Sequence, residues 1–249
     1  MDKTKPIIAL DFQDRGQVEN FLGQFDEALN VKVGMELFYS SGLDMIHAIK
    51  AQGHDIFLDL KLHDIPNTVK GAMRALAGSG VAMINVHTLG GKEMMVAARE
   101  GLILGTPTGQ ASPILLGVTQ LTSTSPQQVK EEQLVTASME AVVTHLAGLA
   151  KDAGLDGVVC SPLEAGQIKT QMGPQFLTVT PGVRIVQGQD DQKRTSNPYQ
   201  AALMGSDYIV VGRPITKAID PVQAYQQMKD QWQEGLKERH QREKELKHD

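Results

Sequence analysis

Charged side chains crowd one short stretch of the sequence, Asp59-Leu60-Lys61-Leu62-His63-Asp64. The stretch ends an apolar run that is typical of a buried strand, and successive side chains of a strand point to opposite faces. Asp59 and Lys61 therefore share one face, with their Cα atoms about 7 Å apart. Because charges are costly to bury unless they are paired or functional, the pattern predicts acid–base or electrostatic chemistry at the end of this strand.

Two earlier apolar runs also end in charged residues that the same alternation turns inward. Ile8 and Leu10 face outward in the first run, so that Asp11 faces inward, and Lys32 faces inward in the second. If the three runs are neighbouring strands about 4.8 Å apart, five charges converge at one mouth. These are Asp11, Lys32, Asp59, Lys61 and Asp64. A structural ion network or a solvated rim charge would explain any one of them, but five together favour a functional site.

A second candidate site follows the last apolar run, at Val211-Gly212-Arg213-Pro214. A glycine lets the backbone approach a ligand closely, and an arginine can hold a phosphate through two hydrogen bonds. A Gly–Arg pair alone is weak evidence, since most such pairs lie in surface turns. Its position after the last strand favours phosphate binding, because (β/α)8 barrels frequently bind phosphate there.

Short apolar runs alternate with segments of helical periodicity along the whole chain. The predicted strands are Pro6–Phe12, Val31–Phe38, Asp55–Leu62, Ala82–Thr88, Ile114–Leu121, Gly157–Ser161, Phe176–Val183 and Tyr208–Ile215. Predicted helices include Gly16–Leu29, Gly42–Gln52, Thr68–Gly78, Lys92–Leu102 and Ser138–Ala153. Eight strands predict an α/β fold of the closed (β/α)8 (TIM) barrel type. An open doubly wound sheet is disfavoured, because no glycine-rich nucleotide loop follows the first strand.

The composition fits a globular chain folded as one domain over residues 1–249, with 41% hydrophobic and 21% charged residues. A net charge of −5 argues against nucleic acid as a partner, because such partners usually need a basic face. We expect no secretory signal and no membrane span. A single cysteine, Cys160, excludes an intramolecular disulfide and fits a reducing cytoplasm.

Two connections and the C-terminal end stand apart from the regular alternation. Thr122–Gln133 and Val186–Asn197 are longer than usual, and both follow the carboxyl ends of strands. Because active sites of (β/α)8 barrels lie at those ends, we expect both segments to act as lids. From about residue 231 the chain is strongly charged, and we expect a solvated helical tail whose end frays.

Motifs over nearly the whole chain resemble those of the orotidine 5'-phosphate decarboxylases of pyrimidine biosynthesis, in their bacterial form. They are Ala9-Leu10-Asp11, Lys32–Glu36, Asp59–Thr68, Val86-His87-Thr88, Leu121-Thr122-Ser123, Val159-Cys160-Ser161, Thr180–Arg184, Asp191–Arg194 and Val211–Thr216. The segment Asp59–Thr68 is the most specific. The resemblance implies an enzyme that converts orotidine 5'-monophosphate (OMP) to uridine 5'-monophosphate (UMP) and CO2 without a cofactor or metal.

The resemblance also implies a role for each charged residue. Lys61 would donate a proton to C6 of the pyrimidine, and Asp59 would lie against the departing carboxylate. Asp11 and Lys32 would contact the ribose hydroxyls, and Lys32 would also hold the charge network of the catalytic residues together. The implied enzyme is an obligate homodimer with shared sites, in which Asp64 and Thr68 reach into the second subunit. The other implied substrate contacts are Thr122 in a loop near the base, Ser161 at the pyrimidine amide, and Arg184, Gln192, Gly212 and Arg213 at the phosphate and its lid.

The implied reaction is difficult because the carbanion left at C6 has no adjacent carbonyl, and the sequence has no motif for a cofactor that would serve as an electron sink. Electrostatics must then stabilise the transition state. Two like charges 4 Å apart repel by about 4 kcal/mol at an effective dielectric constant of 20, so Asp59 would favour release of neutral CO2. The ammonium of Lys61 would contribute more, because it stands where negative charge develops.

Two other functions remain open. A Mg²⁺-dependent hexulose-phosphate synthase or keto-gulonate-phosphate decarboxylase shares the Asp-x-Lys-x-x-Asp strand, but it needs a carboxylate where this chain has Lys32. A non-catalytic phosphosugar or nucleotide sensor would keep Arg213 and have no need of the charge network. We expect His63 and His87 to orient neighbouring groups or to satisfy the core, and Cys160 to be a buried strand residue.

Overall fold

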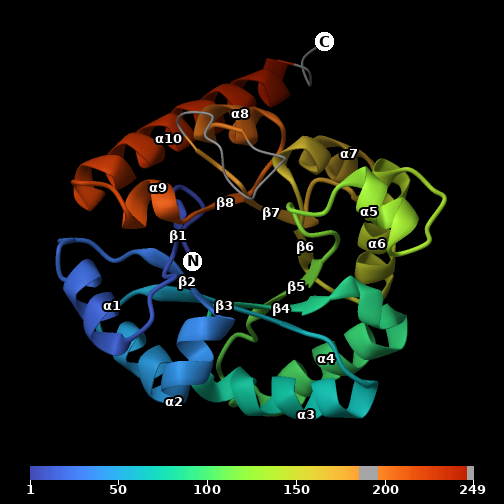
Figure 1. Ribbon diagram of the computed structural model, residues 1–249, viewed down its shortest axis with the longest axis horizontal. Helices are drawn as coiled ribbons and strands as arrows, with labels where there is room; N and C mark the ends of the chain where they lie inside the picture. The colour runs from blue at the N-terminus through green and yellow to red at the C-terminus, as the bar shows by residue number, and fades with distance from the viewer. Residues whose placement is uncertain (185–195, 246–249) are drawn as a thin grey trace.

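Eight parallel strands form a closed barrel in the computed structural model, which describes residues 1–184 and 196–245 (Figure 1). The strands are β1 (Ile7–Ala9), β2 (Asn30–Gly34), β3 (Asp55–Leu62), β4 (Met83–His87), β5 (Ile114–Val118), β6 (Gly157–Val159), β7 (Leu177–Pro181) and β8 (Tyr208–Val211). Each strand pairs with the next one in the chain, and β8 pairs with β1. The prediction of a (β/α)8 barrel is confirmed.

Helices surround the barrel on its outer side (Figure 1). They are α1 (Arg15–Leu22), α2 (Met35–Ala51), α3 (Pro66–Leu76), α4 (Gly91–Gly105), α5 (Pro126–Glu131), α6 (Met139–Asp152), α7 (Pro162–Met172), α8 (Pro198–Leu203), α9 (Arg213–Thr216) and α10 (Pro221–Glu245), with short 3-10 turns η1 (Ala77–Ser79) and η2 (Thr88–Gly90). Each of the five helices predicted by range corresponds to one of them. The second prediction began too late, because α2 starts at Met35 and is only kinked at Gly42, whose φ is +62°.

Most predicted strands extend beyond the observed ones, and two extend the furthest, each past a glycine. The second strand was predicted to reach Phe38 and the eighth Ile215, but β2 ends at Gly34 and β8 at Val211, directly before Gly212. Helices α2 and α9 begin at the next residue after each glycine. The apolar residues that follow were assigned to strands because a short apolar run does not distinguish a strand from a buried helix.

Alternation along the strands creates two separate hydrophobic layers. Outward side chains such as Ile8, Leu58 and Leu60 pack against the helices. Inward side chains fill the barrel itself: Ile7, Ala9, Phe57, Met83, Leu116, Val179, Tyr208 and Val210. We predicted that the leucines of the first and third strands face outward and that the alternating residues face inward. This prediction is confirmed for the first strand and, in the third, up to Leu60. The filled interior closes the lower barrel and leaves its upper mouth for polar groups.

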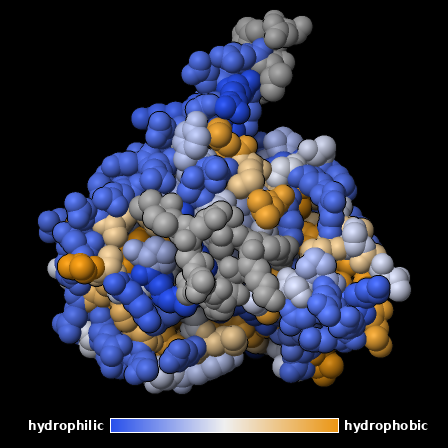
Figure 2. Space-filling model, turned by 45° about the horizontal axis from the view of Figure 1, so that its top comes forward, coloured by the Kyte–Doolittle hydropathy of each residue, from blue (hydrophilic) through white to orange (hydrophobic). Residues whose placement is uncertain are grey.

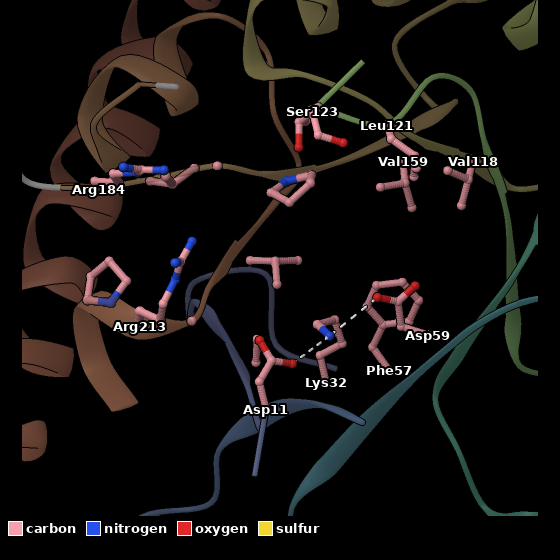
Figure 3. Close-up of a pocket in the computed structure, with 18 of the residues that line it drawn as sticks. Asp11, Lys32, Phe57, Asp59, Val118, Leu121, Ser123, Val159, Arg184 and Arg213 are labelled. Atoms are coloured by element: carbon pink, nitrogen blue, oxygen red, sulfur yellow. Dashed lines mark hydrogen bonds and ion pairs between the residues drawn. The ribbon is translucent and has the colours of Figure 1, made fainter. Parts of the chain in front are cut away.

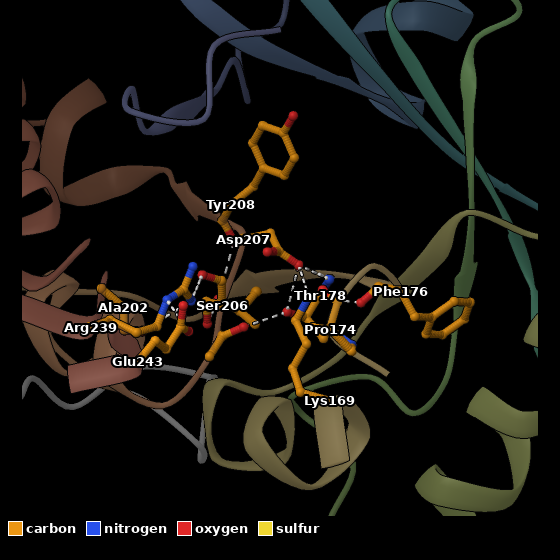
Figure 4. A network of polar contacts seen from close by, with 12 residues as sticks. Lys169, Pro174, Phe176, Thr178, Ala202, Ser206, Asp207, Tyr208, Arg239 and Glu243 are labelled. Carbon is orange, nitrogen blue, oxygen red and sulfur yellow. Dashed lines mark hydrogen bonds and ion pairs between the residues drawn. The ribbon is translucent and has the colours of Figure 1, made fainter. Parts of the chain in front are cut away.

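Aspartates stabilise the opposite rim, where the strands begin. Asp207, just before β8, accepts a hydrogen bond from the backbone N–H of Thr178 at 2.8 Å and pairs with Lys169 (Figure 4). Asp156, before β6, accepts from the backbone N–H of Leu115 at 2.7 Å and pairs with Arg99. Each carboxylate links the start of one strand to its neighbour and to a helix, which holds the register of the barrel from below.

The C-terminal helix α10 crosses α8 and then projects from the barrel (Figure 1). Its projecting end is mainly hydrophilic (Figure 2), in agreement with the expected charged tail. The first part of that tail is not solvated, however, because Trp232 is fully buried and its indole N–H donates to the carbonyl of Lys3 at 2.9 Å. Arg239 also binds the carbonyls of Ala202 and Ser206. No helix of residues 1–184 and 196–245 is long and apolar enough to span a membrane.

Close packing of α3 on α4 depends on Gly101. A Cβ atom there would lie 2.3 Å from the carbonyl oxygen of Lys70 and 3.0 Å from Cβ of Met73, so the two helices would have to separate. We expect Gly101→Ala to lower the free energy of unfolding by about 1–3 kcal/mol, measured by urea denaturation. Gly148→Ala in α6 is the control, because its Cβ would meet only the flexible end of Met172 at 3.7 Å. Equal stability of the two variants would contradict the packing argument.

Candidate active site

A cavity of about 490 Å³ opens at the carboxyl ends of the strands (Figure 3). Its volume is in the range of small-molecule sites. Two kinds of polar group face each other across it. Asp11, Lys32 and Asp59 lie on one side, and Arg184 and Arg213 lie at the other end (Figure 3).

A chain of ion pairs connects four of the five charges that the sequence predicted to converge. The ammonium of Lys32 lies 3.3 Å from Oδ1 of Asp11 and 3.4 Å from Oδ2 of Asp59. The ammonium of Lys61 lies 2.7 Å from Oδ1 of Asp59. Negative and positive groups therefore alternate from Asp11, just after β1, across β2 to β3, and Asp59 is the carboxylate that two ammonium groups share.

Burial and pairing act in opposite directions on the two inner groups. Burial alone would raise the pKa of Asp59, but Lys32 and Lys61, together with hydrogen bonds from Lys61 and Asn85, outweigh it and hold that pKa below its ordinary value. Burial alone would lower the pKa of Lys32, but Asp59 and Asp11 outweigh it and raise that pKa. Both groups are thus held in their charged forms at neutral pH.

The backbone of Lys61 departs from the strand that carries it. Its φ is +51°, a left-handed conformation that costs roughly 1–2 kcal/mol for a residue other than glycine. The pairing of β3 with β4 shifts at the same place, between Leu58 and Leu62. Simple alternation predicted that Lys61 faces the cavity, and Lys61 does line it, but through a bulge that the sequence pattern did not indicate.

Sequence reasoning also missed Asn85 on β4, which is fully buried. Its side-chain amide donates to Oδ1 of Asp59 at 2.7 Å and accepts from the backbone N–H of Lys61 at 2.8 Å. One signal was available, because a single asparagine interrupts the otherwise apolar run Met83–Val86. Buried polar groups in such a run need a partner.

Cationic side chains gather at the other end of the cavity. Arg184, Arg213 and Lys217 all line it, and Arg184 is largely buried. Gly212 lines the cavity beside them, and a Cβ atom there would lie 3.5 Å from Oδ2 of Asp11. Three positive charges beside a glycine make this end suitable for an anion such as a phosphate monoester.

The segment after β5 covers a further side of the cavity. Thr122 lines the cavity, and so do Leu121 and Ser123. The segment contains the short helix α5 and is tied to β5 by a reciprocal amide pair, in which Gln120 and Gln133 exchange hydrogen bonds of 2.8 and 3.2 Å. Gln120 is buried and lines the cavity, and no pattern along the chain indicated that it pairs with Gln133.

Other predicted site residues lie away from the cavity or outside the described residues. Ser161 is fully buried and its hydroxyl caps α7, whereas the serine that lines the cavity is Ser123. Asp64 and Thr68 are exposed beyond the end of β3, and Asp64 accepts a hydrogen bond from the N–H of Ile65 rather than joining the ion pairs. Gln192, and most of the predicted lid Val186–Asn197, lie outside the described residues.

The remaining candidates have no direct place in the ion-pair chain. The rings of His63 and His87 are 5.7 Å apart, and burial together with His63 and Lys61 lowers the pKa of His87. Cys160 is buried and lines the cavity at the end of β6.

Comparison with known proteins places this arrangement in one family. The model of the orotidine 5'-phosphate decarboxylase / HUMPS family matches residues 4–228. The chain is 58% identical over 230 residues to orotidine 5'-phosphate decarboxylase of Listeria monocytogenes, covering 92% of this chain and 98% of that protein. Identity to the enzyme of the same name from Lactococcus lactis subsp. cremoris is 52% over 235 residues, covering 93% of this chain and 99% of that protein.

The crystal structure of orotidine 5'-phosphate decarboxylase from Lactobacillus acidophilus superposes with a TM-score of 0.83 at 45% identity, covering 92% of this chain and 98% of that one. The chain therefore belongs to the orotidine 5'-phosphate decarboxylase / HUMPS family.

Proposed function

We propose that this protein is an orotidine 5'-phosphate decarboxylase, a carboxy-lyase that converts OMP to UMP and CO2 in the last step of UMP biosynthesis. The observation that carries the proposal is the chain of alternating charges that ends in the contact of Lys61 with Asp59 at 2.7 Å, opposite a cationic end of the same cavity. The relatives named above carry this activity in their names. A cytoplasmic location fits the lone Cys160.

The substrate would lie across the cavity with its phosphate at the cationic end. Arg184, Arg213 and the backbone near Gly212 would hold the phosphate. We propose Gln192, which lies outside the described residues, as a further phosphate contact. Asp11 and Lys32 would bind the ribose hydroxyls. The pyrimidine would then lie near the segment after β5, at Thr122, where Ser123 is better placed than the predicted Ser161 to contact the base.

The chemistry follows from the charges at the reacting end. When the bond from C6 to the carboxylate breaks, its electron pair stays on C6 and neutral CO2 leaves. Lys61 would stabilise that pair and then transfer an ammonium proton to C6, giving UMP and a neutral amine that regains a proton from water. Asp59 would disfavour the bound carboxylate by repulsion and so assist its departure. Binding at the remote phosphate would offset that repulsion.

We propose that the reaction needs neither cofactor nor metal ion. The Mg²⁺-dependent alternative is disfavoured by Lys32, whose ammonium lies between the carboxylates of Asp11 and Asp59, where a divalent cation would need negative ligands. The sensor alternative leaves the two ion pairs of the buried Asp59 without a purpose.

An assay that follows loss of the OMP chromophore tests the metal-free reaction. Activity should be undiminished after dialysis against a chelator, and added Mg²⁺ should not increase it, because the ammonium groups supply the positive charge. Loss of activity with chelator and its recovery with Mg²⁺ would favour the alternative enzyme class. No turnover under any of these conditions would contradict the decarboxylase proposal itself.

Replacement of Lys61 tests its role as the proton donor. Lys61→Ala should lower kcat by at least about 10³-fold, while UMP, which has no carboxylate at C6, still binds with a Kd within about threefold of the original. Stopped assays give kcat and calorimetry gives the Kd. Lys151→Ala, an exposed position in the last turn of α6, is the control and should match the unchanged enzyme. Normal turnover by Lys61→Ala would rule out the proposed donor.

We further propose that the active enzyme is a homodimer whose sites are shared. Apolar side chains are exposed where the chain leaves β2, β3 and β4, three neighbouring strands. Met35 is 45% exposed, Tyr39 70%, Ile65 67% and Leu89 48%. A second subunit that covers them would bury the apolar surface of each.

The position of Asp64 and Thr68 supports the shared site. Both are exposed beside Ile65, within the surface that the partner would cover. In the symmetric dimer that we propose, each would extend toward the mouth of the other barrel. Asp64 would then stand near the partner subunit's copy of Lys61.

Mixing two inactive variants tests this arrangement. Lys61→Ala and Asp64→Ala should each be inactive alone, but after subunit exchange a mixed dimer contains one site with both native residues. Statistical exchange of equal amounts should restore about a quarter of the original activity. The control is a mixture of Lys61→Ala with Asp59→Ala, which removes two residues of the same subunit's site and should restore no activity. No recovery in the first mixture, once exchange is verified by mass spectrometry, would contradict a shared site.

A further inference from the structure

Asn85 is a buried polar residue at the top of an apolar barrel interior. It follows Met83 on the inward face of β4, and Met83 belongs to the apolar layer that fills the barrel. Asn85 has no exposed surface, although its amide carries both donors and an acceptor. Such a group remains buried at a cost unless its hydrogen bonds are made.

The side-chain amide of Asn85 lies at a gap in the backbone pairing between β3 and β4. Leu58 pairs with Ile84 and Leu62 pairs with Val86, so three residues of β3 lie opposite Asn85 alone. Backbone pairing therefore cannot serve all three of them. The side-chain carbonyl of Asn85 accepts the N–H of Lys61 at 2.8 Å and takes the place of the missing backbone acceptor.

This hydrogen bond holds a backbone conformation that lysine disfavours. The φ of Lys61 is +51°, and the left-handed region is costly for a residue with a Cβ atom. Two contacts oppose relaxation to an extended strand, namely the bond of its N–H to Asn85 and the bond of its ammonium to Asp59 at 2.7 Å. Asn85 acts on the backbone end and Asp59 on the side-chain end.

The other end of the same amide orients Asp59. Its NH2 group donates to Oδ1 at 2.7 Å, the oxygen that also receives the ammonium of Lys61. Oδ2 remains for Lys32 at 3.4 Å. The amide has one possible orientation, because a flip would set its NH2 against the N–H of Lys61 and its oxygen against a carboxylate.

We propose that Asn85 is a positioning residue for the decarboxylation, which fixes the backbone of Lys61 and the carboxylate of Asp59 relative to each other through one planar amide. The inference rests on the proposed function. It adds that the geometry of Lys61 and Asp59 on β3 depends on a residue of the neighbouring strand β4. The side chain at position 85 must accept a hydrogen bond from the N–H of Lys61 and donate one to the carboxylate of Asp59.

Two substitutions separate this role from simple packing. Asn85→Ala removes both hydrogen bonds and should lower kcat by about 100-fold or more, because a small displacement of a reacting group is costly, whereas UMP should bind within about threefold of the original Kd. Asn85→Asp keeps the shape and the acceptor for Lys61 but replaces the donor with a second carboxylate against Asp59. The number of folded sites is measured by titration with UMP. Dividing the rate by that number gives kcat for the folded enzyme alone.

The Asn85→Asp variant should recover as the pH falls. Asp59 and Lys61 on β3, Lys32 on β2 and His87 on β4 lie around the introduced carboxyl. The two ammonium groups already pair with Asp11 and Asp59, so the new carboxyl meets Asp59 at hydrogen-bonding distance without a cation of its own, and this repulsion together with burial raises its pKa. Once protonated, the carboxyl donates to Asp59 as the amide does. The ratio of variant to unchanged kcat should therefore rise about tenfold or more from about pH 8.5 to about pH 5.5, while the ratio for Asn85→Ala stays flat. His87 is present in both the variant and the unchanged enzyme, so its titration cancels in the ratio of their kcat values.

Asn30→Ala is the matched control, because Asn30 is also a buried strand asparagine but binds the carbonyls of Asp2 and Lys5 at the opposite rim. It should lower the melting temperature and leave kcat of the folded enzyme within about threefold. The positioning role is wrong if Asn85→Ala behaves like Asn30→Ala, or if the ratio for Asn85→Asp does not depend on pH. An inactive unchanged enzyme would instead contradict the proposed function, so the two failures are distinguishable.

Discussion

The carboxylate of Asp59, shared by two ammonium groups, is the interaction on which the mouth of the barrel depends. It lies in a mainly apolar setting where an isolated charge would be strongly disfavoured. Lys32 and Lys61 make its ionised form the favoured one, and Asp11 in turn balances Lys32. Three adjacent strands must therefore bring their charged residues together, and the fixed register of the closed barrel does so. Lys32 aligns with Ala9 and Phe57, so that its long side chain extends up to Asp59, two residues further along β3.

Two rims of the same barrel use charge for different purposes. Below, Asp156 and Asp207 bind backbone N–H groups and cations, so that their charges hold neighbouring strands together. Above, the charges bind mainly one another and face a cavity. The apolar layer between the rims keeps the two sets apart, which allows the upper set to be strained, as at Lys61, without loosening the strand register below.

Much of this organisation could be predicted from the sequence, because it rests on periodicity. Alternation along a strand was enough to place Asp11, Lys32 and Asp59 inward, and eight apolar runs were enough for the barrel. Features that depend on contacts between distant segments could not be predicted in this way. The bond of Asn85 to Lys61 spans two strands, and the bulge at Lys61 breaks the alternation on which the prediction relied. The capping role of the Ser161 hydroxyl was also not predicted, because a motif gives the order of residues and not the direction of a hydroxyl.

The neutrality of the ion-pair chain also limits how such a site can evolve. Asp11, Lys32, Asp59 and Lys61 carry two negative and two positive charges, and the loss of one inner member leaves an unbalanced charge in a poorly solvated place. Selection should therefore remove single mutations of these four residues even where a double mutation would be tolerated. A new chemistry on this scaffold should then arise by paired substitutions, such as a lysine and an aspartate changed together. Proteins of this fold with different chemistry should differ at these positions by linked rather than independent substitutions.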